Sequence, residues 1–116
     1  MQTRTIEYTD GDVTLKGFLA LDERQSTPRP GILVMPEAFG LGAHVKQRAE
    51  RLAAQGYVTL AGDPYGDGIE LSDLQEAIKL ASALSADPSR FRRRARVALD
   101  KLASLPQVDQ IGRAHV

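Results

Sequence analysis

Two short loops carry the residue types that could do chemistry in this chain of 116 residues. In the first, MPEAFGLG, Glu37 directly follows an apolar run; the second is GDPYGDG, which begins at Gly62. A carboxylate in such a turn can orient a catalytic group or a substrate, or it can cap the next helix or pair with an arginine. Ala38 and Phe39 supply backbone N–H groups just before a helix, a geometry that can stabilise a developing oxyanion.

Gly40, Gly42 and Asp63 offer an alternative, a Rossmann-like dinucleotide-binding module. The two glycines precede a helix, and Asp63 lies about 20 residues further on, as the Rossmann fingerprint requires. Val45 replaces the third glycine of that fingerprint, and Glu37 would repel a pyrophosphate. Glu37 and Asp63 could instead share Mg²⁺, but the sequence offers no third ligand, so we predict no metal site and no cofactor.

Nucleophiles are scarce. The chain has no cysteine, which excludes disulfides and a thiolate nucleophile from these residues, and its histidines are His44 and His115. No glycine pair brackets a serine in the G-x-S-x-G pattern of a nucleophile elbow.

A basic run, RFRRRAR at residues 90–96, could contact phosphates. The same segment carries an apolar stripe at helical spacing, so we expect its arginines on the solvated face of a helix. Lysine plus arginine equals aspartate plus glutamate, 15 against 15, and no nucleic-acid partner is predicted.

Hydrophobic periodicity predicts the elements that position the two loops. TRTIEYTDGDVTLKGFLAL alternates with period two around Asp10-Gly11, which predicts a β-hairpin. GILVM and YVTLAG are apolar runs typical of buried strands, and residues 43–56 between them predict an amphipathic helix that ends at Gly56. Its apolar face comprises Val45, Ala49, Leu52 and Ala53. The resulting parallel β-helix-β unit brings both loops to one edge of a sheet.

Two further helices are expected. Ser72 and Gln75 suggest a capping box for the first, whose apolar face would comprise Leu74, Ile78, Ala81 and Leu84. Asp87 and Pro88 begin the second, with Phe91, Ala95, Ala98, Leu102 and Leu105 along one face. The length suits one α/β domain. No run is long enough to cross a membrane, and the N-terminus lacks the apolar region of a signal peptide, so a cytoplasmic location is expected.

The segment GILVMPEAFGLGAHVKQRAERLAAQGYVTLAGDPYGDG, with the hairpin before it, resembles the N-terminal half of the dienelactone hydrolase family of α/β-hydrolases, from about Thr5 to Asp109. The resemblance implies a hydrolase that attacks small ester or lactone carbonyls by nucleophilic catalysis. It implies that Glu37 tunes the ionisation of the nucleophile, that Ala38 gives an oxyanion-hole N–H, and that Phe39 and Tyr65 bind substrate. Asp67 stands near the place where some members have an arginine for the substrate carboxylate, so dienelactone itself need not be the substrate.

In the family, the nucleophile follows the helix that here ends near Leu105, and the acid and the histidine come later. Val108 and Asp109 match the start of the nucleophile segment. Residues 111–116, IGRAHV, are interpreted as a non-native tail after a hydrolase-like part at 1–110; alternatively, Ile111 and Gly112 start the native strand. We therefore expect this chain alone to be inactive, and the unpaired edge of the strand at 31–35 to favour self-association.

Overall fold

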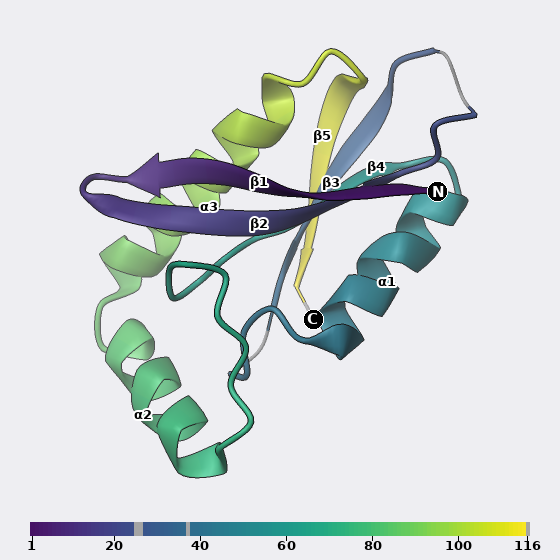
Figure 1. The fold of residues 1–116 in the computed structure, drawn as a ribbon. Helices are drawn as coiled ribbons and strands as arrows, with labels where there is room; N and C mark the ends of the chain where they lie inside the picture. The colour runs from purple at the N-terminus through teal and green to yellow at the C-terminus, as the bar shows by residue number, and fades with distance from the viewer. Residues whose placement is uncertain (25–26, 37, 116) are drawn as a thin grey trace.

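The structure is a computed structural model that describes residues 1–24, 27–36 and 38–115, and of residues 110–115 it describes the backbone only. Within these residues one mixed sheet contains β1 (Gln2–Asp10), β2 (Val13–Leu21), β3 (Arg29–Met35), β4 (Val58–Ala61) and β5 (Val108–His115). The helices are α1 (Ala43–Ala54), α2 (Leu74–Ser85) and α3 (Pro88–Ala103). The strand order is β1-β2-β4-β3-β5, so the β3-α1-β4 unit lies in the middle of the fold (Figure 1).

The predicted β-hairpin is confirmed. β1 and β2 pair antiparallel from Gln2↔Leu21 to Asp10↔Val13, and Gly11 in the turn has a φ of 58°. β2 continues the sheet by pairing antiparallel with β4. The hairpin is therefore an integral part of the sheet that carries the candidate site.

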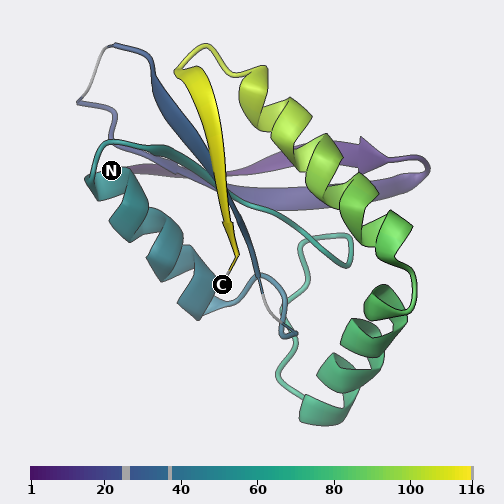
Figure 2. The ribbon, with the colours of Figure 1, turned by 180° about the vertical axis from the view of Figure 1, so that it is seen from behind.

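The predicted parallel unit is also confirmed, because β3 pairs parallel with β4 from Gly31↔Val58 to Val34↔Ala61. Successive side chains of a strand point to opposite faces. Leu33 and Met35 belong to the core cluster that contains α3 residues, whereas Val34 packs in the cluster with α1. The two helices thus cover opposite faces of the sheet, as the views in Figures 1 and 2 show.

α2 differs from the prediction in its cap and in its buried face. Asp73, not Ser72, is the N-cap, and its side chain accepts a hydrogen bond from the Gln75 N–H at 3.1 Å. Leu84 is buried as predicted, but Leu74 and Ile78, expected on the same buried face, are 61% and 54% exposed. Ala77, which was not predicted, is buried with Leu84. α2 packs against α3 rather than on the sheet, so the side of α2 that faces α3 is the side that is buried.

α3 begins as predicted, with the Asp87 carboxylate accepting from the Arg90 N–H at 3.2 Å and Pro88 in the first turn. The expectation that its arginines are all solvated is wrong for Arg94, which is 7% exposed. The Arg94 guanidinium donates to the Pro64 carbonyl at 2.6 Å and to Asp10 at 3.2 Å. Hydrogen bonds from Arg93, with further help from Arg94, hold the pKa of Asp10 below its ordinary value.

β5 alters the expectation about the sheet edge. It pairs parallel with β3 from Arg29↔Val108 to Met35↔His115, so β3 is paired on both sides and the sheet ends at β5. The expectation of an unpaired β3 edge is wrong in this structure. An edge-to-edge contact between copies would have to form at β5, and such self-association stays a prediction. Within the described residues, no helix is both long and apolar enough to span a membrane.

Candidate active site

The loops that follow β3 and β4 meet at the carboxyl edge of the sheet, as the parallel arrangement requires. The Leu41 N–H donates to the Ile69 carbonyl at 3.1 Å, and the Leu71 N–H donates to the Phe39 carbonyl at 2.7 Å. Between these bonds Gly40 forms an antiparallel bridge with Glu70. The two loops are thus joined by main-chain hydrogen bonds, so a displacement of one loop is transmitted to the other.

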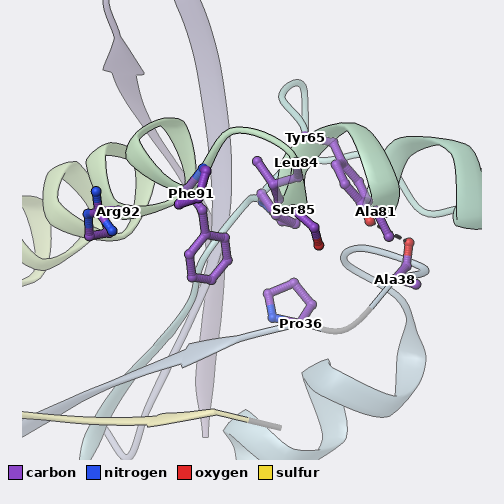
Figure 3. Close-up of a pocket in the computed structure, with 10 residues that line it drawn as sticks. Pro36, Ala38, Tyr65, Ala81, Leu84, Ser85, Phe91 and Arg92 are labelled. Atoms are coloured by element: carbon purple, nitrogen blue, oxygen red, sulfur yellow. Dashed lines mark hydrogen bonds between the residues drawn. The ribbon is translucent and has the colours of Figure 1, made fainter.

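Tyr65 adds a side-chain link between the loops. Its hydroxyl donates to the Ala38 carbonyl at 2.8 Å (Figure 3). Burial raises the pKa of the Tyr65 hydroxyl above its ordinary value. The sequence-based pairing of Ala38 with Tyr65 in one site is therefore matched by a direct contact.

Asp63 shapes the loop that carries Tyr65. The Asp63 side chain is 1% exposed and accepts four backbone N–H groups. The donors are Lys16 at 2.9 Å, Tyr65 at 3.2 Å, Gly66 at 2.9 Å and Gly68 at 2.7 Å. With both oxygens engaged in this way, Asp63 holds the turn after β4 to the adjacent strand β2.

Tyr8 of β1 also holds Asp63 in place. The Asp63 N–H donates to the Tyr8 hydroxyl oxygen at 3.0 Å. Burial is the main reason that the pKa of Tyr8 is raised to about 12. The hairpin therefore fixes Asp63 through both its backbone and its side chain.

An apolar cavity of about 460 Å³ opens beside the Tyr65–Ala38 contact. Its walls come from the two strand ends and from the junction between α2 and α3: Pro36, Ala38, Pro64, Tyr65, Ala81, Leu84, Ser85, Pro88, Phe91 and Arg92. In Figure 3, Tyr65 points toward Ala38, and Phe91 and Pro36 line the other side of the space. Phe91 and Ser85 were not predicted as site residues, because the helices that carry them reach the loops only in the tertiary fold.

The other predicted site residues are placed differently. Phe39 is 43% exposed and lines a second hollow of about 330 Å³ together with His44 and Glu70, so it does not share the cavity of Tyr65. Glu37, the predicted nucleophile-tuning carboxylate, lies outside the described residues. Its role stays a prediction.

The geometry does not support a dinucleotide site on Gly40, Gly42 and Asp63. The Asp63 carboxylate is buried and occupied by backbone N–H groups, so it is not free to bind a ribose or a metal ion. At Gly42, a Cβ would lie 2.6 Å from a Glu70 carboxylate oxygen, which places a negative charge where a pyrophosphate would approach. A pyrophosphate bound there would be repelled rather than held.

The sheet order, the parallel β3-α1-β4 unit and the two loops at the carboxyl edge define part of an α/β-hydrolase fold. The model of the dienelactone hydrolase family matches residues 15–113, and the chain belongs to this family. Two solved structures, m3DLH and a dienelactone hydrolase-like promiscuous phosphotriesterase from metagenomic libraries, are each 40% identical to it with a TM-score of 0.93. Each match covers 98% of this chain and 48% of the other chain.

A more distant solved structure agrees on the fold, and a curated protein matches part of the sequence. The dienelactone hydrolase from Anabaena variabilis is 22% identical with a TM-score of 0.64, covering 98% of this chain and 50% of that chain. A Yersinia pestis protein, named provisionally as a carboxymethylenebutenolidase, is 31% identical over 67 residues, which are 55% of this chain and 25% of the relative. The chain thus spans about half the length of the solved structures that it matches.

Proposed function

We propose that this chain provides the oxyanion and substrate-binding side of a hydrolase active site that acts on small ester or lactone carbonyls. The observation that carries the proposal is the direct contact between the two strand-end loops, the hydrogen bond from Tyr65 to Ala38, beside an apolar cavity that both residues line. Membership of the dienelactone hydrolase family supports hydrolysis as the reaction class.

In the proposed reaction, a nucleophile adds to the carbonyl carbon and the carbonyl oxygen becomes an oxyanion. The Ala38 N–H donates to that oxyanion, a contact that strengthens as negative charge develops and so favours the transition state. The oxyanion collapses and expels the alcohol, and water then releases the acid from the acyl intermediate. Glu37 is proposed to tune the ionisation of the nucleophile.

The nucleophile, the histidine and the acid are proposed to follow these residues in a longer protein, with residues 1–110 as the N-terminal part of its hydrolase domain. The 116-residue chain alone is then inactive, because loss of single triad members already costs several orders of magnitude in rate. A small-molecule ester or lactone substrate and a cytoplasmic location belong to the same proposal. Residues 111–116 are proposed to be non-native.

The first test is to read the gene past the codon for Gln110. We expect a G-x-C-x-G or G-x-S-x-G segment within about 15 residues. The 116-residue chain should give no p-nitrophenyl acetate turnover above a boiled control, whereas the longer protein should be active. Turnover by the 116-residue chain, or a native gene that ends after residue 116, would overturn this division of the active site.

The second test separates Glu37 from a neighbouring carboxylate in the longer protein. Glu37→Gln should lower kcat by about tenfold or more and shift the pH profile, because it removes the charge that sets the ionisation of the nucleophile. Glu70→Gln is the matched control, since Glu70 lines the second hollow rather than the main cavity. Equal effects of the two substitutions would argue against a special role for Glu37.

A further inference from the structure

The first loop is anchored to the second at two successive carbonyl groups. The Ala38 carbonyl accepts from the Tyr65 hydroxyl at 2.8 Å, and the Phe39 carbonyl accepts from the Leu71 N–H at 2.7 Å. The second of these bonds is a main-chain contact that any sequence with this fold could make. The first depends on one side-chain atom, so it is the contact through which a side chain controls the backbone at Ala38.

The backbone on either side of the Tyr65 side chain is held by hydrogen bonds. The Tyr65 N–H donates to the Asp63 carboxylate at 3.2 Å, and the carbonyl of the preceding Pro64 accepts from the buried Arg94 at 2.6 Å. The proline ring also restricts the backbone before Tyr65. A tyrosine held on both sides in this way can transmit the position of the sheet and of α3 to the first loop.

The direction of the hydrogen bond defines what Tyr65 can do. A phenolic hydroxyl has one proton, and this one is donated to the Ala38 carbonyl. A substrate oxygen would have to compete for that proton with a carbonyl already in place. The hydroxyl of Tyr65 therefore binds the first loop rather than a substrate, while Tyr65 also lines the cavity.

We propose that Tyr65 is a positioning residue, whose hydroxyl holds the Ala38 carbonyl and thereby restrains the backbone that carries the Ala38 N–H beside the apolar cavity. This inference rests on the proposed function of Ala38 as an oxyanion donor. Such donors act at 2.7–3.1 Å from the oxyanion, a tolerance of a few tenths of an ångström that a loop held by fewer contacts does not maintain. Because the peptide group is planar, holding the carbonyl of Ala38 also fixes the next N–H, that of Phe39.

The test uses the 116-residue chain, labelled with ¹⁵N, and compares Tyr65→Phe with Tyr57→Phe. Tyr57 is a partly buried tyrosine at the opposite end of β4, so its substitution controls for the loss of a hydroxyl. Acetophenone, an uncharged aryl ketone that is not hydrolysed, is titrated as the carbonyl probe. Three quantities are measured: the urea midpoint, the hydrogen-exchange rates of the Leu41 and Leu71 amides, and the amide shift of Ala38 during the titration.

We expect Tyr65→Phe to keep the urea midpoint of Tyr57→Phe and to bind acetophenone with a Kd within about twofold of the unsubstituted chain. The Leu41 and Leu71 amides should exchange about tenfold faster, as loss of one hydrogen bond predicts. The response of the Ala38 amide to acetophenone should be lost. If the Tyr65 hydroxyl had only a structural role, its loss would not abolish the Ala38 amide shift while leaving the Kd for acetophenone unchanged.

Two results would overturn the positioning role. Unchanged exchange rates and an unchanged Ala38 response in Tyr65→Phe would show that the hydroxyl does not hold the loop. A fall in the urea midpoint well beyond that of Tyr57→Phe would assign the hydroxyl to general stability. If the unsubstituted chain does not bind acetophenone, the proposed carbonyl site fails, and the exchange rates alone then decide whether Tyr65 positions the loop.

Discussion

The buried carboxylate of Asp63 allows a sharp test of how the second loop is built. Asp63→Asn keeps the size of the side chain but replaces one oxygen by an NH₂ group. Each Asp63 oxygen accepts two backbone N–H groups: Tyr65 and Gly66 donate to one, and Lys16 and Gly68 to the other. Whichever way the asparagine turns, its NH₂ group faces two donors.

The expected cost follows from this count. A hydrogen bond to a charged group contributes about 1.5–3 kcal/mol, so two lost bonds correspond to about 3–6 kcal/mol. Removing a buried charge returns part of that, because the neutral amide is less costly to bury than a carboxylate. We expect the free energy of unfolding to fall by about 3 kcal/mol, which corresponds to a Tm lower by about 10 °C for a chain of this size.

Urea unfolding at neutral pH measures the difference, and Asp67→Asn in the same loop is the matched control. Asp67 is 75% exposed at its side chain, pairs with Lys16 at 3.0 Å and has a φ of 59°, which asparagine tolerates. An exposed ion pair is worth little, so this control should change stability by less than about 1 kcal/mol. If Asp63→Asn is no more costly than Asp67→Asn, the Asp63 carboxylate does not hold the loop, and Tyr65 lacks the support that its positioning role requires.

Two further predictions concern the same scaffold. Gly40→Ala should lower the free energy of unfolding, measured with urea, clearly more than Gly11→Ala. Both glycines have a positive φ, which costs about 1–2 kcal/mol for alanine. Only at Gly40, however, would the added Cβ collide with the Ile69 carbonyl oxygen. Equal costs would contradict a close approach of the two loops. The pKa of Tyr8 is raised from 10.0 to about 12 in the folded chain, so on raising the pH Tyr8 loses its proton first in the unfolded chain. Its contribution to the free energy of unfolding, about 2–3 kcal/mol, is therefore full below pH 10 and is lost as the pH rises through about 12. Unfolding measured from pH 8 to 12 should therefore show a steeper alkaline loss in the unsubstituted chain than in Tyr8→Phe, and parallel curves would refute this.

The central part of the fold was predictable because it depends on local patterns. The alternation around Asp10-Gly11 and the continuous apolar run at Gly31–Met35 each match one structural class, and both were assigned correctly. The meeting of the loops after β3 and β4 followed from the rule that parallel strands open their carboxyl ends at one edge. These inferences need only neighbouring residues in the sequence.

The errors arose where tertiary packing decides between two locally acceptable arrangements. Leu74, Ile78 and Leu84 share helical spacing, but α2 packs on α3, so Leu84 and Ala77 are buried while Leu74 and Ile78 are exposed. Arg94 looks like a surface residue in a basic run, because its partner Asp10 lies 84 positions away in the chain. No local pattern contains that information.

The support for the second loop explains why the hairpin belongs to the candidate site. β1 supplies the Tyr8 hydroxyl under Asp63, and β2 supplies the Lys16 N–H to the Asp63 carboxylate. The end of β1 also supplies Asp10, which holds Arg94 against the Pro64 carbonyl. A loop fixed from both strands of the hairpin and from α3 has little freedom of its own, so its tyrosine can set the position of a second loop. The hairpin therefore acts on the site by fixing the loop from which Tyr65 reaches Ala38.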